Sequence, residues 1–362
     1  MNPLLRFRSL SVLGLMLPLL TAPPLRGTEK MQVPFHVKVA FSTSYDDNIL
    51  KYSNNDLHRF ETNTEAFPSE ITTSDDWVNA LGLRVYRDFD LGRRFRLRGY
   101  YSGKISLYAV NQIKNYQSHY FSARLSYRSR GYLTLKYSYL PSYYLRIYKD
   151  RDWNAYHGAQ FDLSRPAVSL RWRSSIAEIE GELGREFVYY NEYFTEYDSR
   201  AYYWGLSALR RFVENLDVSL GYTFTSSDNI GFDQSAGLPS QDPLTDTEYG
   251  DATYEEDEYT LRLSYLLPLE SHWDWRIEFG YRHSDRFYQS QLPLAQDGFH
   301  TGREDHRNIF TPSLTISPLS TLDLELVFSY DQRRSDSPNA SVPKIKNYDE
   351  RTFEIGIVYQ IF

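Results

Sequence analysis

The 362-residue chain has no cysteine, only three methionines and no long apolar run beyond its N-terminus. The lack of cysteine excludes a disulfide scaffold, a thiolate zinc site and a cysteine nucleophile. After the N-terminus, no segment approaches the roughly 18 apolar residues that a membrane-spanning helix needs. Because methionine and alanine are good helix formers and both are scarce, a helical bundle is also disfavoured.

Aromatic residues are abundant instead, although the mean hydropathy is −0.55. The chain holds 32 tyrosines, 21 phenylalanines and six tryptophans. Aromatic side chains favour strands and also gather at membrane interfaces. The composition therefore indicates an all-β protein. The formal charge of −7 argues against a nucleic-acid partner.

The N-terminus has the pattern of a secretory signal. Arg6 and Arg8 precede an apolar run over residues 10–20, and the sequence Thr21-Ala22-Pro23-Pro24 ends it. This run is too short to span a bilayer comfortably. We expect residues 1–27 to be a signal peptide and the protein to be exported.

From Val33 onward, apolar and polar residues alternate with a period of two, which is typical of strands. Fourteen segments show this pattern, and most reach roughly 10 to 15 residues once extended, enough to cross a bilayer at a tilt. These segments are 35–42, 80–86, 95–107, 121–127, 133–139, 168–173, 177–183, 201–209, 216–224, 261–267, 273–281, 310–316, 322–330 and 353–361.

The connections alternate in length. Those after even-numbered strands are tight (88–93, 128–131, 174–175, 212–215, 268–271 and 317–321). Those after odd-numbered strands are mostly long and polar (46–76, 148–160, 227–256, 288–304 and 332–347), while 110–113 and 191–198 are shorter. This predicts an all-β, up-and-down antiparallel transmembrane barrel of about 14 strands, formed by residues 28–362 as one domain. A secreted sandwich or a soluble barrel would also alternate, but sandwich strands are usually shorter.

Two short segments resemble known proteins. The alternating run 353–361, followed by Phe362, resembles the C-terminal signal of bacterial outer-membrane barrels, although Phe362 is one residue out of phase. The run Tyr45-Asp46-Asp47-Asn48 resembles porin-type barrels often associated with exopolysaccharide and other envelope loci. Strand-exit turn chemistry explains its polar residues equally well. The resemblance implies a bacterial outer-membrane location, with membrane lipid and the barrel-assembly machinery as partners.

The polar face of each predicted strand should line the lumen, and its charges sort along the chain. We expect strands one to six to form a basic arc without any acid, and strands seven to fourteen an acidic arc relieved by a few arginines. The basic arc comprises Lys38, Arg84, Arg96, Arg98, Lys104, Arg124, Lys136, Arg171 and Arg173. The acidic arc comprises Glu178, Glu180, Glu182, Asp217, Asp274, Glu278, Asp323, Glu325 and Glu354.

The turn at 174–175 should set Arg171 opposite Glu178, where the two arcs meet. Across the lumen the arcs would create a transverse field that favours polar or zwitterionic solutes. The simpler interpretation is that charges on a lumen wall merely neutralise one another.

A barrel of this width should hold a water-filled lumen unless a loop folds inward, with 46–76 and 227–256 the longest candidates. We therefore predict a porin-like channel for passive diffusion of small polar solutes, including saccharides. One alternative is a structural or docking barrel that meets a larger envelope or polysaccharide-export complex through its loops. A lipid hydrolase is the other, but the chain lacks a nucleophile elbow, an HExxH motif and any nucleotide fingerprint. We expect no enzymatic activity, no cofactor and no metal.

Overall fold

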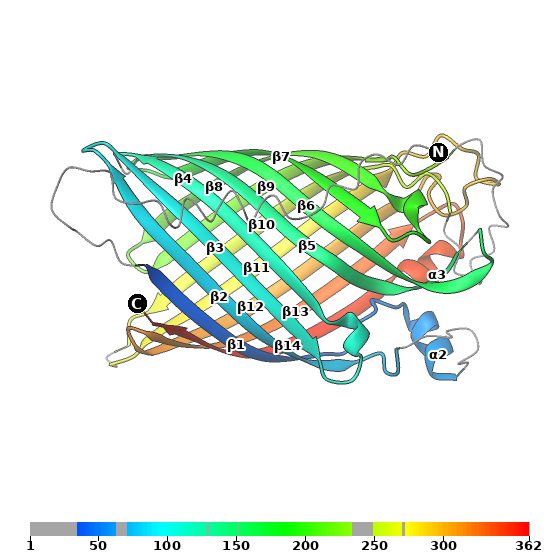
Figure 1. The fold of residues 1–362 in the computed structure, drawn as a ribbon, viewed down its shortest axis with the longest axis horizontal. Helices are drawn as coiled ribbons and strands as arrows, with labels where there is room; N and C mark the ends of the chain where they lie inside the picture. The colour runs from blue at the N-terminus through cyan, green and yellow to red at the C-terminus, as the bar shows by residue number, and fades with distance from the viewer. Residues whose placement is uncertain are drawn as a thin grey trace.

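The computed structural model describes residues 35–62, 71–128, 130–150, 152–233, 249–269 and 272–361. In this part of the chain, fourteen antiparallel strands close into one barrel, in which each strand pairs with its neighbours in sequence and the first pairs with the last (Figure 1). The strands are β1 (His36–Asp46), β2 (Asp76–Leu91), β3 (Phe95–Tyr108), β4 (Tyr116–Tyr127), β5 (Gly131–Asp150), β6 (Ala155–Arg173), β7 (Glu178–Tyr190), β8 (Ser199–Val213), β9 (Leu216–Asn229), β10 (Tyr254–Leu267), β11 (Asp274–Tyr288), β12 (Glu304–Leu319), β13 (Leu322–Asp336) and β14 (Tyr348–Gln360).

The tight turns all lie at one end of the barrel, the turn end, where β1 begins and β14 finishes. The longer connections lie at the other, the loop end (Figure 1). The loop end carries helices α2 (Asn54–Thr62) and α3 (Val342–Lys346) and the single 3₁₀ turns η1 (Gln112–Lys114) and η2 (Thr195–Tyr197). The predicted 14-stranded antiparallel barrel is confirmed. The expected signal peptide, residues 1–27, and the terminal Phe362 lie outside the described residues.

Several strands run further toward the loop end than the sequence pattern predicts. The expected long loop at 148–160 is wrong, because β5 and β6 remain paired until Asp150 lies opposite Ala155. Two register shifts in this part of β5, between Leu140 and Tyr143 and between Tyr144 and Arg146, interrupt the period of two while the backbone ladder continues.

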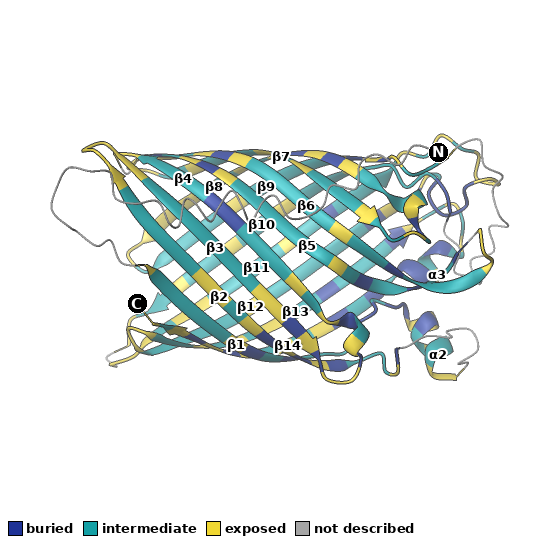
Figure 2. Cartoon of the chain, viewed as in Figure 1, coloured by how far each residue is buried: buried dark blue, intermediate teal, exposed yellow. Residues whose placement is uncertain are grey.

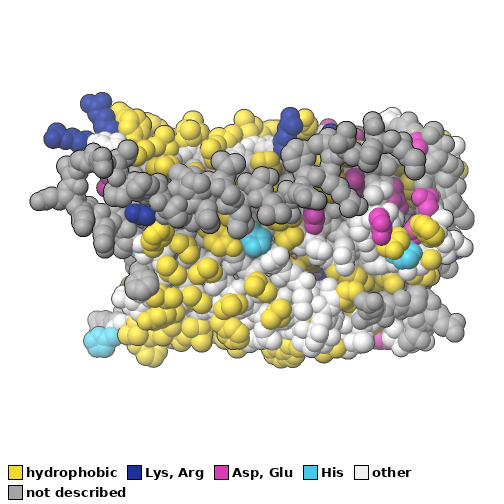
Figure 3. Space-filling model, viewed as in Figure 1, with side chains coloured by type: hydrophobic (Ala, Val, Ile, Leu, Met, Phe, Trp, Pro, Cys, Tyr) yellow, Lys and Arg dark blue, Asp and Glu magenta, His cyan; other side chains and the backbone are white. Residues whose placement is uncertain are grey.

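The outer face of the barrel is apolar over its middle. Leu135, Leu170 and Leu183 point outward and are 59, 64 and 62 % exposed. Exposing a leucine to water costs about 1.5–3 kcal/mol, and Figure 3 shows hydrophobic side chains covering much of the visible wall. A soluble monomer rarely exposes such a large patch. This band therefore faces an apolar medium.

On β11 and β12 an aromatic pair marks the limit of the band toward the loop end. The rings of Tyr281 and Phe310 join the two strands with a centroid distance of 4.9 Å. Beyond this pair the outer face of the two strands turns polar, as in the 2.6 Å contact between His306 Nδ1 and Asp285 Oδ1. Tyrosine suits such a boundary, because its ring is apolar and its hydroxyl can be hydrated.

Closure through β1 and β14 leaves no open sheet edge, which a bilayer could not satisfy. The register is continuous, from Lys38 opposite Gln360 to Asp46 opposite Thr352. Among the described residues, no helix combines the length and the hydropathy needed to cross a bilayer.

The best-packed apolar core lies at the loop end rather than in the middle of the barrel (Figure 2). Residues of the first long connection pack there against side chains of β2, β3 and β5. The buried members are Ile49, Leu50, Tyr52, Ile71, Val78, Tyr108, Tyr144 and Ile147. Val78 and Tyr108 alternate with the outward Trp77 and Leu107, so this connection packs on the inner side of the wall.

Candidate functional site: the barrel lumen

The strand register separates a lipid-facing set from a lumen-facing set of side chains. Phe41, Leu81 and Ile105 lie opposite one another on adjacent strands and are exposed on the outside. The alternate residues, including Arg84 and Lys104, therefore point inward. Followed around the barrel, the same register places all nine predicted basic residues and all nine predicted acidic residues on the inner face.

The basic arc is not free of acid, and that part of the prediction is wrong. Asp88 and Asp90 belong to β2 and share the inner face. Asp88 accepts two hydrogen bonds from Arg98, of 2.6 and 2.7 Å, and Asp90 accepts one of 2.8 Å from Arg96. The sequence pattern assigned both aspartates to a turn, but β2 continues to Leu91.

The two arcs meet between β5 and β7 in a network of ion pairs. Lys136 Nζ lies 2.8 Å from Glu180 and 2.5 Å from Glu182. Arg171 contacts both Glu178, at 2.8 Å, and Glu180. Charge-assisted contacts of this kind tie neighbouring strands together.

The register corrects the predicted partner at this seam. The residue opposite Arg171 is Glu180, while Glu178 lies opposite Arg173, whose Nε donates to it at 2.6 Å. The turn between β6 and β7 spans four residues rather than two, and this shifts the alignment.

In the described part of the chain, the remaining residues of the two arcs form no ion pairs between the basic and the acidic arc. Asp217 pairs with Arg211 at 2.8 Å, and Glu278 pairs with Arg262 at 2.9 Å. Several others form no ion pair with any residue that the structure describes. These are Lys38, Arg84, Lys104, Arg124, Asp274, Asp323, Glu325 and Glu354.

Two hollows open at the turn end of the lumen. One, of 340 Å³, lies on the inner side of β2–β5 and is lined by Arg96, Arg98 and Arg124, among others. The other, of 480 Å³, lies on β8–β11 and is lined by Arg211, Arg262 and Glu278, among others. The Arg211 and Arg262 side chains are 67 and 66 % exposed. The turn end of the lumen is therefore accessible to water.

At the loop end, the run Tyr45–Asn48 joins β1 to β14. The Asp47 carboxylate accepts a 2.7 Å hydrogen bond from the Arg351 amide. Asn48 Nδ2 donates to the carbonyls of Tyr52 and Asp349, both at 2.9 Å. These contacts fix the strand exit and direct the following residues inward.

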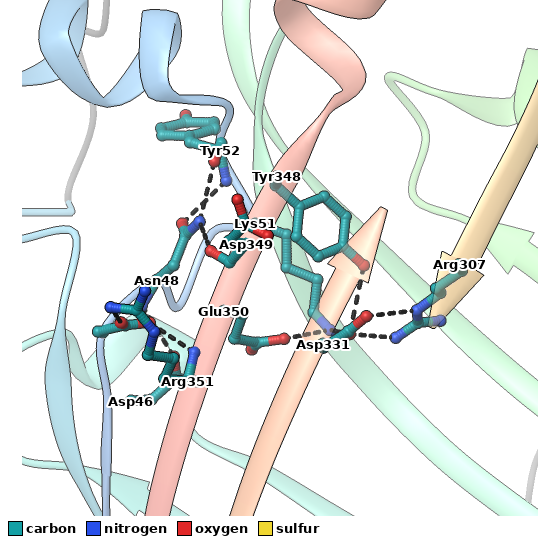
Figure 4. A network of polar contacts seen from close by, with 11 residues as sticks. Asp46, Asn48, Lys51, Tyr52, Arg307, Asp331, Tyr348, Asp349, Glu350 and Arg351 are labelled. Atoms are coloured by element: carbon teal, nitrogen blue, oxygen red, sulfur yellow. Dashed lines mark hydrogen bonds and ion pairs between the residues drawn. The ribbon is translucent and has the colours of Figure 1, made fainter. Parts of the chain in front are cut away.

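Those residues, 47–62 and 71–75, are called the mouth loop below. Lys51 Nζ lies 2.8 Å from Glu350 and 3.0 Å from Asp331, and Arg307 donates two hydrogen bonds to Asp331 (Figure 4). Burial disfavours the charge on Lys51, but the neighbouring carboxylates outweigh this and raise its pKa above the usual range. The mouth loop is thus held by charge against β13 and β14.

The mouth loop also reaches the opposite side of β1. The ring of Tyr52 lies 5.3 Å from the Arg146 guanidinium of β5, while the adjacent Lys51 contacts β13 and β14. The loop therefore crosses part of the loop end of the lumen. Of the two segments considered as inward-folding loops, half of the second lies outside the described residues, at 234–248.

The observations now combine a closed barrel, an apolar outer band with an aromatic boundary, and a charged, water-accessible lumen. Polar groups inside and apolar groups outside are what a bilayer requires of a strand-built protein. The chain is a bacterial outer-membrane β-barrel.

No protein-family model and no curated protein matches the sequence of this outer-membrane barrel. Similar solved structures include an anion-selective porin from Comamonas acidovorans, at 10% identity over 91% of this chain and 99% of the other, with a TM-score of 0.44. The outer membrane channel DcaP of Acinetobacter baumannii is 10% identical over 93% and 100%, with a TM-score of 0.45. A bacterial polysaccharide outer membrane secretin is 11% identical over 90% and 98%, with a TM-score of 0.42.

The sequence pattern missed the charged cluster at the loop end of this outer-membrane barrel. Buried Asp305 lies 2.9 Å from Arg303 and 2.5 Å from Arg333, and Ser335 donates to it. Its strands continue beyond their predicted limits at 310 and 330. The inward residues at 331, 333 and 335 do keep the period of two. The outward residues between them are also polar, so the apolar–polar alternation that predicts a strand is absent.

Proposed function

We propose that this outer-membrane barrel is a channel for passive diffusion of small polar solutes. The observation that carries the proposal is a lumen that opens to solvent at the turn end, where charged side chains line hollows of 340 and 480 Å³. The unpaired basic residues lie on β1–β4 and the unpaired acidic residues on β11–β14. The two sets adjoin where β1 pairs with β14, so a solute near that side of the wall meets a lateral charge gradient.

Saccharides are the neutral solutes that suit this wall best. Tyr100 and Tyr120 face the lumen with their rings 5.8 Å apart, and Tyr86 lies 4.5 Å from the Arg98 guanidinium. A tyrosine offers an apolar ring and a hydroxyl together, which complements the alternating CH and OH groups of a sugar.

Planar-bilayer recordings test the channel and the arcs separately. A purified barrel that never conducts would contradict the channel. In the triple variant R96Q/R98Q/R124Q, we expect ion preference to move toward cations by several-fold, since one charge at ~4 Å in water contributes about 1 kcal/mol. The opposite variant, E278Q/E325Q/E354Q, should move it toward anions. Unchanged preference in both would contradict the arcs.

The mouth loop favours a second candidate, a barrel that docks an envelope partner and opens only with it. Its position across the loop end is the observation behind this alternative. Such a barrel would conduct in bilayers only after a partner was added. In either case the expected surroundings are membrane lipid and the assembly machinery.

We propose no catalytic role for the Ser–Asp–His cluster at the loop end. Asp297 accepts a hydrogen bond from Ser290 at 2.8 Å and contacts His300 at 2.9 Å. The acid thus lies between the serine and the histidine, whereas a catalytic triad needs the histidine in the middle. Release of fatty acid from outer-membrane lipid by the purified protein would contradict a non-enzymatic function.

A further inference from the structure

The 340 Å³ hollow at the turn end, called the arginine hollow below, contains more positive charge than its surroundings neutralise. Six arginines and two aspartates line it. The aspartates are already engaged, Asp88 by Arg98 and Asp90 by Arg96. The other four arginines form no ion pair with any described residue. They are Arg93, Arg94, Arg124 and Arg128.

The strand register places two of the six arginines at directly opposed positions. Arg98 of β3 lies opposite Arg124 of β4, with both side chains on the inner face. The Arg98 guanidinium is held by Asp88 of β2, whereas the Arg124 guanidinium lies beside Tyr132 of β5 and has no carboxylate partner among the described residues. The positive charge of Arg124 therefore stays available to an anion in the hollow.

The second hollow at the same end, called the mixed hollow below, shows that this excess is local. It is lined by three arginines and three acidic residues. Two of those arginines are paired, Arg211 with Asp217 and Arg262 with Glu278. A position at the turn end therefore does not by itself give a hollow an excess of positive charge.

Guanidinium groups bind oxyanions through paired N–H donors, and several of them together select an anion with more than one charged group. The volume of the arginine hollow lies in the range of small-molecule sites. The Tyr132 ring lines the hollow, 5.9 Å from the Arg124 guanidinium, and provides an apolar surface beside the charges.

We propose that the arginine hollow is a binding site for a small polyvalent oxyanion, such as a phosphorylated or polycarboxylate solute. The site deepens the proposed function and rests on it in one respect, that solutes reach the turn end of the lumen. It requires no conduction, so binding and conduction can be measured separately.

Calorimetry on the purified barrel in detergent tests the site, with pyrophosphate, citrate and glucose as probes. We expect pyrophosphate to bind, glucose not to bind, and affinity to fall as salt screens the charges. Citrate distinguishes a general polyanion site from a phosphate-selective one. In R93Q/R94Q/R128Q, affinity should fall at least about tenfold, because each lost charge-assisted hydrogen bond is worth roughly that much.

Two further variants keep the test sharp. The variant D88N/D90N frees Arg96 and Arg98 and should bind pyrophosphate more tightly, which a purely structural role of these residues would not produce. The matched control R211Q/R262Q/R276Q removes three charges from the mixed hollow and should leave affinity unchanged. Heat-modifiable migration on a gel checks that each variant has folded.

No binding of any polyanion by the folded wild-type barrel would overturn the site, even if the barrel conducts. Equal weakening in the two triple variants would also overturn it, because the effect would then reflect net charge alone. Binding without conduction would support the site and contradict the channel.

Discussion

The two ends of the barrel contain the same kinds of charged residue in opposite circumstances. At the loop end, Arg303 and Asp305 are buried and paired, and Lys51 is half-buried and paired. At the turn end, Arg96 and Arg211 are more than half exposed. Charge at the loop end holds structure together, whereas charge at the turn end remains available to solutes.

The largest expected effect comes from the buried cluster at the loop end. Replacing Asp305→Asn should lower the free energy of unfolding by about 3–5 kcal/mol, because Arg303 and Arg333 lose their shared buried carboxylate. Urea unfolding of the barrel in lipid vesicles measures this. The control Asp217→Asn, at the turn end, should hardly move the midpoint, since exposed ion pairs contribute little. Equal losses in the two variants would erase the contrast between the ends.

A smaller effect is expected at the mouth loop. Replacing Lys51→Met removes a half-buried ammonium that joins Asp331 and Glu350. Hydrogen bonds to charged groups are worth about 1.5–3 kcal/mol, so hydrogen exchange at residues 49–52 should quicken by roughly 10- to 100-fold. The exposed Lys344 in α3 serves as the control in Lys344→Met. Unchanged exchange in Lys51→Met would mean that apolar packing alone holds the loop.

The smallest change, about tenfold for one pH unit, is expected at Lys114 in η1, which is 2 % exposed. Burial, partly offset by the carboxylates of Asp46 and Glu350, lowers its pKa to about 7. When η1 opens locally, Lys114 reaches water and regains the ordinary lysine pKa of about 10.4. Between about pH 10.4 and pH 7, protonation of Lys114 therefore favours the open form of η1. The closed state should weaken about tenfold per pH unit as the pH falls toward 7 and then level off.

Hydrogen exchange at residues 112–116 should be measured in wild type and in Lys114→Met. The ratio of the two rates gives the contribution of Lys114 protonation to opening, because the pH dependence of the exchange chemistry itself is the same in both proteins. A flat ratio from pH 9 to 7 would place the lysine in contact with solvent.

The sequence pattern located a strand only where the outward-facing residues of that strand are apolar. Between the aromatic boundaries, one face meets lipid and the other water, so the alternation identified all fourteen strands. Past Phe310 and Tyr330 both faces are polar, and the pattern ended early although the strands continued. Asp88 and Asp90 were lost for a different reason at the opposite end, because the outward Arg87 interrupts the apolar series before it resumes two residues later.

The sequence by itself determined the barrel, the strand order and the inner face, because each follows from local alternation and connection length. Only the tertiary structure decided which charges meet. The seam of Lys136 with Glu180 and the cluster around Asp305 depend on strand register and on loops that return to the wall. The arginine hollow shows the limit most clearly. Arg98 and Arg124 lie 26 positions apart in the sequence, and only the pairing of β3 with β4 places them at directly opposed positions of the wall.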